Sequence, residues 1–305
     1  MKFPLSKYIW FDGKLVPVNM AKVPVTTHAI HYGTSIFEGI RAYWNSKNLH
    51  VFRLKDHVKR FRNSGKFYNI KLNFSDRQIE NAVIDLCKKN KIKKSCYIRP
   101  FYFVGQYGIN FHVTQKAPTH TAIFAFPFGD LFNKSGITAT ISKWRKFSDM
   151  STPTQAKMGG NYLNSILATQ DAKQRGFDEA ILLDQSGNVS EAPGENIFLV
   201  KNDGLVTPPL SSSALDGITR KSIITLAKDM KLKIKVRKVS KKELRLADEI
   251  FLSGTAAEIT PIIRIDKKKI GSGKVGNITK LFMDTYSDIV MNKNENHSHW
   301  LTVVY

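Results

Sequence analysis

The sequence predicts a soluble α+β protein of two domains. The chain has 305 residues, more than one domain usually holds. Hydrophobic residues make up 42% and charged residues 24%, a balance typical of globular proteins with a sizeable core. Short strand-like runs alternate with helix-like runs in the first third, whereas the remainder is richer in short strands and turns. We therefore expect a small α+β domain followed by a larger, strand-rich domain.

The first domain is predicted to contain two helices between strands. Residues 48–53 alternate in the manner of a half-buried strand, and apolar residues recur at helical spacing from Leu54 onwards. A second helix is predicted to begin at Ser75, because a glutamine follows three residues later, as in a capping box. Aromatic and β-branched residues at 97–104 and 121–126 favour two further strands.

A change in composition marks the predicted boundary between the domains. We expect a small domain over residues 1–127, an interdomain loop rich in Gly and polar residues over 128–137, and a large domain over 138–305. In the large domain, many short strands with turn signals are interrupted by helices near 163–175 and 219–230.

The composition also indicates the cellular setting. No apolar run approaches the roughly 18–20 residues that a membrane-spanning helix needs, and the N-terminal segment lacks the apolar stretch of a signal peptide. The two cysteines, Cys87 and Cys96, are too few for a disulfide framework and are not spaced as a C-x-x-C pair. We therefore expect a cytoplasmic protein that does not act at a membrane.

The net charge of +22 raises the alternative of a nucleic-acid-binding protein. Only 12 of the 47 basic residues are arginine, the residue type that often contacts phosphates and base edges, and the lysines are dispersed along the chain. A solvated, lysine-rich surface is the simpler interpretation, and no nucleic-acid partner is expected.

Two local patterns propose chemistry that their surroundings do not support. The string Gly271–Gly276 matches the G-x-G-x-x-G dinucleotide fingerprint, but too few residues follow it for the βαβ unit that the fingerprint requires. We expect a loop before the last helix. The pairs His28 with His31 and His297 with His299 lack neighbouring ligands with metal-site spacing, so no metal site is expected.

Six segments, in order along nearly the whole chain, carry a family resemblance. They are HAIHYGTSIFEGIRAY (28–43), CYIRPFYFVG (96–105), AKMGGNYLNSILA (156–168), SEAPGENIF (190–198), SSSALDGITR (211–220) and SGTAAEITP (253–261). Together they resemble the branched-chain amino-acid aminotransferases. The resemblance implies a fold-type IV enzyme that uses pyridoxal 5′-phosphate (PLP), with a small α+β domain and a larger domain built around a pseudo-barrel.

The resemblance assigns cofactor-binding roles to individual residues. Lys157 would form the Schiff base with PLP and move the proton during the reaction. Glu191 would hold the pyridine nitrogen protonated; Glu195, four residues later, is the competing candidate that the motif disfavours. Tyr162 would bond the cofactor's phenolic oxygen. The implied phosphate contacts are Arg60, Ile218, Thr219 and Thr255. The helix predicted to begin near Thr219 suits this role, because backbone N–H groups and the helix dipole attract anions there.

Substrate contacts follow from the same resemblance. The implied set comprises an apolar wall of Tyr32, Phe37 and Tyr162, α-carboxylate contacts from Tyr97, Thr255 and Ala256, and a charged rim residue, Arg99. Tyr97 and Arg99 are two apart, so on a strand they share a face. The sequence departs from the family pattern at Pro193, Phe128 and Leu131.

The implied reaction is transamination of L-leucine, L-isoleucine and L-valine with 2-oxoglutarate, which yields branched-chain 2-oxo acids and L-glutamate. This places the expected enzyme in leucine, isoleucine and valine biosynthesis. Same-fold alternatives are a D-amino-acid aminotransferase and an aminodeoxychorismate lyase. The resemblance also implies a homodimer or an assembly of dimers, in which the segment around Tyr32 reaches the neighbouring subunit's pocket.

Overall fold

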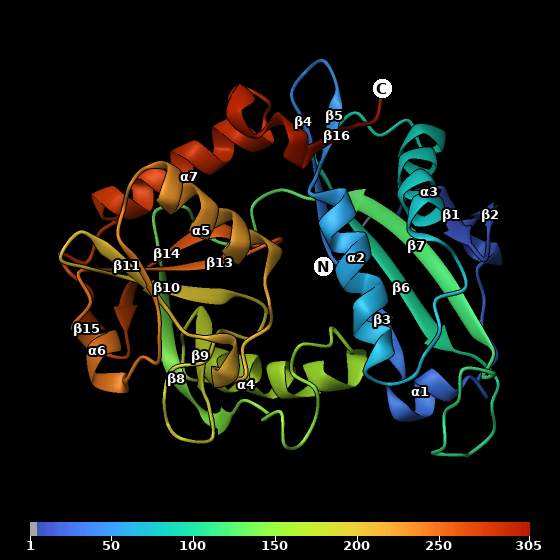
Figure 1. Cartoon of the computed structure of the whole chain (residues 1–305), viewed down its shortest axis with the longest axis horizontal. Coiled ribbons are helices and arrows are strands. Elements are labelled where there is room, and N and C mark those ends of the chain that lie inside the picture. The colour runs from blue at the N-terminus through green and yellow to red at the C-terminus, as the bar shows by residue number, and fades with distance from the viewer. Residues whose placement is uncertain (1–4) are drawn as a thin grey trace. The chain divides into compact units, whose positions relative to one another are not determined.

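The computed structural model describes residues 5–305, which form two compact units (Figure 1). Unit 1 comprises the residues up to Gly129 together with 156–160 and 288–305. Unit 2 comprises 130–155 and 161–287. None of the helices in the described part of the chain is long and apolar enough to cross a membrane.

Unit 1 is built on one sheet with strand order β16-β5-β4-β6-β7-β1-β2, in which β3 also pairs with β6. The strands are β1 (Tyr8–Phe11), β2 (Lys14–Pro17), β3 (Ser35–Phe37), β4 (Ile40–Trp44), β5 (Leu49–Phe52), β6 (Cys96–Val104), β7 (Thr119–Pro127) and β16 (Leu301–Val303). The helical elements are η1 (Val18–Met20), α1 (His28–Tyr32), α2 (Leu54–Lys66), α3 (Asp76–Lys89) and η4 (Glu295–Trp300).

The predicted helices and strands of unit 1 are present. Helix α3 begins after Ser75, whose side chain accepts the backbone N–H of Gln78 in the expected capping box. The apolar sides of α2 and α3 share one core with strand β6, where Ile98, Tyr102 and Val104 are buried. Because side chains alternate along a strand, the residues between them on β6 face the opposite side of the sheet.

The C-terminal residues differ from the sequence expectation, which placed them in the large domain. Strand β16 pairs antiparallel with β5, Trp300 packs edge-on against Phe52, and the Arg53 guanidinium lies over the Trp300 ring. These contacts assign residues 288–305 to unit 1. The C-terminal segment joins unit 1 because β5 would otherwise be an edge strand with unpaired backbone N–H and C=O groups, and β16 pairs with them.

Unit 2 contains a second sheet with strand order β12-β11-β10-β13-β14-β8-β9, in which β15 pairs with β14. Its strands are β8 (Ile137–Arg145), β9 (Glu179–Leu183), β10 (Asn196–Lys201), β11 (Gly204–Thr207), β12 (Ile234–Val236), β13 (Glu249–Gly254), β14 (Glu258–Ile265) and β15 (Lys268–Lys269). The helices are α4 (Tyr162–Gln174), α5 (Ile218–Asp229), α6 (Lys241–Arg245) and α7 (Asn277–Val290), with the short turn η3 (Leu210–Ser212). The last residues of α7 and the first two of the short turn η2 (Gly159–Asn161) are assigned to unit 1.

The glycine string Gly271–Gly276 is a loop between β15 and α7, as predicted. The first turn of α7 is already bound by a carboxylate of the chain itself, because Glu249 accepts the backbone N–H groups of Ile278 at 3.1 Å and Thr279 at 2.7 Å. A Cβ on Gly276 would collide with the Glu249 side chain, so glycine is needed there for close packing.

Cys87 and Cys96 are buried and are not joined by a disulfide. Among residues 5–305 there is no group of three or more His, Cys, Asp or Glu side chains that could hold a metal ion.

Candidate active site

Lys157 lies in unit 1, in a segment held by backbone hydrogen bonds. Its N–H donates to the Ser64 hydroxyl at 3.0 Å, and its carbonyl accepts the Phe37 N–H at 3.1 Å. The ammonium group lies 4.7 Å from the centroid of the Phe37 ring. A Cβ on Gly159 would collide with the Ser35 hydroxyl. The small residues that follow the lysine therefore allow its segment to lie directly against β3.

Arg99 and Tyr97 share one face of β6, as their spacing predicts. The Arg99 guanidinium lies 4.7 Å from the Phe37 ring and 5.3 Å from the Tyr97 ring, and it donates to the Tyr97 hydroxyl at 3.3 Å. Its Nε is buried and has no hydrogen-bond partner in the described structure. Phe37 is therefore the ring that Arg99 and Lys157 both contact, and it joins three predicted residues into one cluster.

Arg60 occupies a buried network that the sequence reading did not foresee. The fully buried Glu38 carboxylate accepts the Arg60 Nε–H at 2.6 Å and an Nη2–H at 2.8 Å, and Nδ1 of His57 donates to it at 2.8 Å. Burial opposes the charge on Glu38, but the Arg60 and His57 contacts outweigh it and hold the pKa of Glu38 well below its usual range. Burial lowers the pKa of His57, although Glu38 partly counters the effect.

In unit 2, the buried Glu191 carboxylate is bound by three donors. Oε2 accepts the Asn196 side-chain amide at 3.0 Å and the Leu215 backbone N–H at 2.9 Å. Oε1 lies 2.7 Å from Nζ of Lys146. Glu195, the competing candidate, accepts a hydrogen bond from the neighbouring Gly194 N–H at 3.1 Å.

The first turn of α5 presents backbone N–H groups as hydrogen-bond donors. Its N-cap residue offers them no side-chain acceptor. Gly217 is the N-cap and has no side chain that could accept from the first turn, which contains Ile218 and Thr219. A Cβ on Gly217 would collide with the amide oxygen of Asn196, so the glycine permits this close approach. Thr255 and Ala256 lie in the turn between β13 and β14, and α5 packs on β13.

Tyr162 and Tyr32 both lie at ends of helices. Tyr162 is the first residue of α4 and is half-buried. Tyr32 ends α1, where it packs against His28 and Phe111, with ring centroids 4.6 Å and 5.2 Å away, and 36% of it is exposed. Tyr32 therefore packs against other aromatic rings, whereas Phe37 lies beside the cations of Arg99 and Lys157.

Three departures from the family pattern also have defined positions. Phe128 packs against Tyr97, with ring centroids 5.4 Å apart, so this position still lines the Tyr97 side of unit 1. The Pro193 carbonyl accepts the Ser165 hydroxyl at 2.7 Å, next to the Glu191 segment. Leu131, in unit 2, is exposed.

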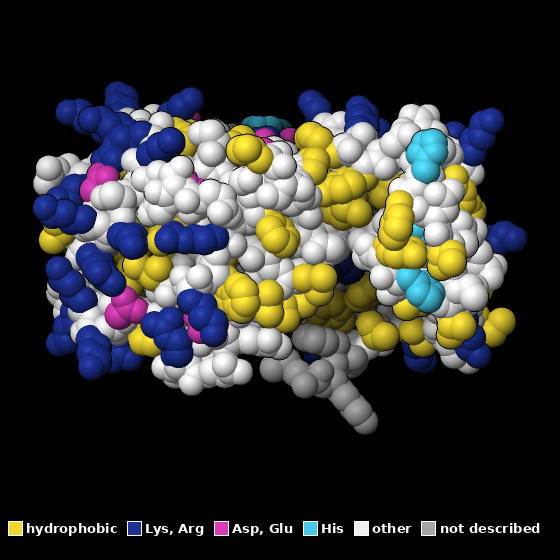
Figure 2. Space-filling model, turned by 90° about the horizontal axis from the view of Figure 1, so that it is seen from below, with side chains coloured by type: hydrophobic (Ala, Val, Ile, Leu, Met, Phe, Trp, Pro, Cys, Tyr) yellow, Lys and Arg dark blue, Asp and Glu magenta, His cyan; other side chains and the backbone are white. Residues whose placement is uncertain are grey.

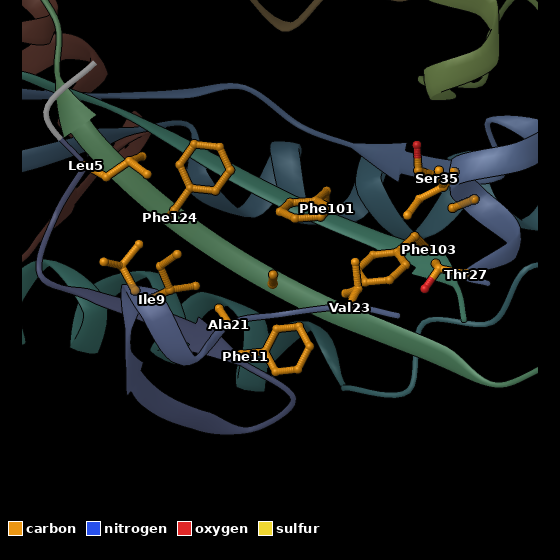
Figure 3. A pocket seen from close by; sticks show the side chains of 14 residues that line it. Leu5, Ile9, Phe11, Ala21, Val23, Thr27, Ser35, Phe101, Phe103 and Phe124 are labelled. Atoms are coloured by element: carbon orange, nitrogen blue, oxygen red, sulfur yellow. The ribbon is translucent and has the colours of Figure 1, made fainter. Parts of the chain in front are cut away.

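An apolar groove of about 500 Å³ runs over the sheet of unit 1 (Figure 3). Phe101 and Phe103 line it from β6, Phe124 from β7 and Ile30 from α1. It lies on the face of β6 that carries Tyr97 and Arg99, opposite the face that packs on α2 and α3, as the alternation of side chains requires. In Figure 2, hydrophobic side chains gather over the middle and the right of the face, whereas Lys and Arg are densest on the left.

Sequence reasoning missed four residues that hold the predicted ones: Ser64, Glu38, His57 and Lys146. His57 and Arg60 are three apart on one helix, so their shared face was open to prediction. Lys146 carried no signal, because one lysine among many cannot be distinguished by sequence.

Comparisons with known proteins identify the family of the chain. The model of the family "Amino-transferase class IV" matches residues 35–265. The branched-chain-amino-acid aminotransferase of Escherichia coli (strain K12) is 42% identical over 303 residues, 98% of each chain. A probable branched-chain-amino-acid aminotransferase of Aquifex aeolicus (strain VF5) is 40% identical over 302 residues, 98% of this chain and 97% of its own.

Solved structures extend the likeness to the whole fold. A branched-chain aminotransferase of Thermoproteus uzoniensis with norvaline has a TM-score of 0.95 at 41% identity, covering 98% of this chain and 100% of its own. The branched-chain amino acid aminotransferase of Thermobaculum terrenum, in its PLP-bound holo-form, has a TM-score of 0.94 at 33% identity, covering 99% of each chain.

The chain belongs to the class IV aminotransferase family. All four relatives described above are branched-chain aminotransferases or probable ones, the group that the six sequence segments predicted. The predicted fold class, α+β with the fold of this family, is likewise confirmed.

Proposed function

We propose that this chain is a PLP-dependent transaminase that exchanges amino groups between L-leucine, L-isoleucine or L-valine and 2-oxoglutarate. The observation that carries the proposal is the 42% identity to a branched-chain enzyme over 98% of both chains. No observation favours the D-amino-acid aminotransferase or the aminodeoxychorismate lyase.

The residues present fit PLP. When bound, PLP supplies an aldehyde that reacts with amines and a ring that withdraws electrons from the substrate's α-carbon. In unit 2, Glu191 is a buried carboxylate suited to the pyridine nitrogen, and the first turn of α5, whose N-cap is a glycine, suits the phosphate through Ile218 and Thr219. Thr255 and Arg60 are the remaining proposed phosphate contacts.

In unit 1, Lys157 is the proposed catalytic amine. The Phe37 ring and the fixed backbone of its segment restrict where the ammonium group can lie. Its task is to remove the proton from the substrate's α-carbon and return one to the cofactor, so it must give up its own charge during the cycle. Tyr162, at the start of α4, is proposed to donate its hydroxyl to the cofactor's phenolic oxygen.

Substrate selection is assigned to an apolar wall with one cation. Phe37 offers an aromatic face to a branched aliphatic side chain, together with Tyr162 and, from the neighbouring subunit, Tyr32. Arg99 supplies the charge that the second carboxylate of glutamate needs, while Phe37 and Tyr97 hold its guanidinium by cation–π contact. Tyr97, Thr255 and Ala256 are the proposed contacts of the substrate α-carboxylate. One pocket can thus accept both apolar and acidic side chains.

The test is a panel of amino donors with 2-oxoglutarate, run on the native protein, Lys157→Ala and the exposed control Lys94→Ala. Leucine, isoleucine and valine should be good donors for the native protein and the control, and Lys157→Ala should lose turnover. Borohydride reduction with PLP should attach the cofactor to Lys157, as peptide mass spectrometry can show. Substantial turnover by Lys157→Ala, or preference for D-amino acids, would contradict the proposal.

We also propose that the enzyme works in the cytoplasm as a homodimer, or as an assembly of dimers. Large apolar side chains are exposed around α1, including Val25 at 82%, Ile30 at 61% and Phe111 at 83%. Ile30 also lines the groove of unit 1, so groove and exposed side chains are continuous. A monomer rarely leaves so much apolar surface in water, and a second copy of the chain is the proposed partner.

A subunit-mixing experiment tests whether Tyr32 serves the neighbouring subunit. Lys157→Ala and an inactivating Tyr32 variant are unfolded, mixed and refolded together. If the two residues act in pockets of mixed origin, one pocket of the mixed dimer carries both lesions and the other carries neither, so activity returns. A mixture that stays inactive, while native protein treated alike recovers, would show that Tyr32 serves its own subunit.

A further inference from the structure

Lys146 and Glu191 form a largely buried ion pair in unit 2. Nζ of Lys146 lies 2.7 Å from Oε1 of Glu191, and the two side chains are only 14% and 5% exposed. The pair Lys201–Asp248 in the same unit is 50% and 49% exposed. Burial distinguishes the Lys146 pair, because charges removed from water persist only when a partner compensates them closely.

Different groups orient the Glu191 carboxylate and place a positive charge beside it. The Glu191 carboxylate is already oriented at Oε2 by two uncharged donors, the Asn196 amide and the Leu215 N–H. The Lys146 backbone is anchored on both sides, since its N–H donates to the Leu183 carbonyl at 2.9 Å and its carbonyl accepts the Gln185 amide at 2.7 Å. What Lys146 adds to the carboxylate is therefore a positive charge at Oε1.

We propose that Lys146 is a positioning residue that acts through Glu191 and keeps the proton shared with the cofactor on the pyridine nitrogen. The proposal rests on the role of Glu191 in the proposed function. A proton between a carboxylate and a pyridine nitrogen can reside on either group. The Lys146 ammonium beside Oε1 stabilises the negative charge of the carboxylate. It therefore favours the arrangement in which the carboxylate is charged and the pyridine nitrogen carries the proton. The ring withdraws electrons more strongly in that arrangement.

The test compares the native holoenzyme with Lys146→Met, Lys146→Arg and the surface control Lys201→Met. The readout is the nitrogen-15 chemical shift of PLP labelled at its pyridine nitrogen, measured without substrate. In Lys146→Met we expect this shift to move toward the unprotonated value. The kcat for leucine should fall by about 10- to 100-fold, the range typical for the outer partners of a ligating group, with KM nearly unchanged. Lys146→Arg should restore both values, and Lys201→Met should match the native enzyme.

Several outcomes would overturn the proposal. One is a native nitrogen shift in folded Lys146→Met. Another is tighter PLP binding by that variant, which would show that Lys146 competes with the cofactor for the carboxylate. If Lys146→Met and Lys146→Gln both fail to fold while Lys201→Met folds, the lysine is structural and the proposal is wrong. Glu191→Gln forms a separate arm, because an unchanged nitrogen shift there would refute the role of Glu191 itself.

Discussion

The hydroxyl of Ser64 accepts the backbone N–H of Lys157 at 3.0 Å. Ser64 lies in α2 and is buried, and the segment that carries Lys157 is separated from it by more than ninety positions in the sequence. This contact links a helix of unit 1 to the backbone of the proposed catalytic lysine, so changes at Ser64 should affect the lysine without touching its amine.

Ser64→Ala is expected to remove the hydroxyl that accepts the Lys157 N–H in a partly buried position. Such a loss costs about 1–3 kcal/mol, so the melting temperature and kcat should both decrease. Thermal unfolding and leucine turnover would measure this. Ser287→Ala, at an exposed helical serine, is the matched control and should change neither. Equal behaviour of the two variants would show that the hydrogen bond contributes nothing.

Arg99→Leu should impair the half-reaction with glutamate far more than the half-reaction with leucine. A carboxylate placed against Phe37 without the guanidinium would lack a partner for its charge, whereas a leucine side chain does not use that charge. Single-turnover rates with each amino acid would measure the difference. Arg77→Leu, at an exposed helix position, should affect neither rate. Equal losses in both half-reactions with Arg99→Leu would make Arg99 structural.

The Glu38–His57–Arg60 network should make stability fall on acidification. Burial lowers the pKa of His57 in the folded protein, and the pKa of Glu38 is held low as well. The unfolded chain therefore binds protons more readily at both groups. The His57 contribution is present above about pH 6.5 and is lost as the pH falls below it; the Glu38 contribution is lost only below about pH 4.5.

His57→Gln should remove the loss of stability that His57 causes as the pH falls below about 6.5. The slope of the unfolding free energy between pH 7 and pH 5 should decrease by at most about 1.4 kcal/mol per pH unit, the effect of one proton. Denaturant unfolding at several pH values would measure the slope. His112→Gln, at an exposed histidine, is the control. An unchanged slope in His57→Gln would contradict the prediction.

Glu249→Ala should destabilise the start of α7. The Glu249 carboxylate accepts the N–H groups of Ile278 and Thr279, which no longer have this acceptor in the variant. The loss of such a cap costs about 0.5–2 kcal/mol. Denaturant unfolding would detect it, and Glu243→Ala, which removes a capping partner in the short helix α6, gives a comparison at a more exposed site.

NAD should not bind, although Gly271–Gly276 matches the dinucleotide fingerprint. A pyrophosphate would need the N-terminus of the helix that follows, and the Glu249 carboxylate already lies there with its negative charge. Calorimetric titration of the native protein with NAD would measure this. A micromolar dissociation constant would overturn the interpretation.

Local features of unit 1 could be predicted from the sequence because backbone geometry alone imposes them. The capping box at Ser75 joins residues three apart, so the start of α3 follows from the local sequence. Tyr97 and Arg99 lie on one face because side chains alternate along any strand. Family resemblance added Lys157 and Glu191, whose chemistry no composition or spacing distinguishes.

Contacts between distant segments were decided only by the tertiary structure. Lys146 meets Glu191 because β8 and β9 pair in parallel and lead the chain back to the carboxylate, a register that no local pattern encodes. Packing between distant segments likewise joins Glu38 to α2 and seats β16 on β5. Local periodicity reports which face a residue occupies, but the partner on that face depends on how the whole chain packs.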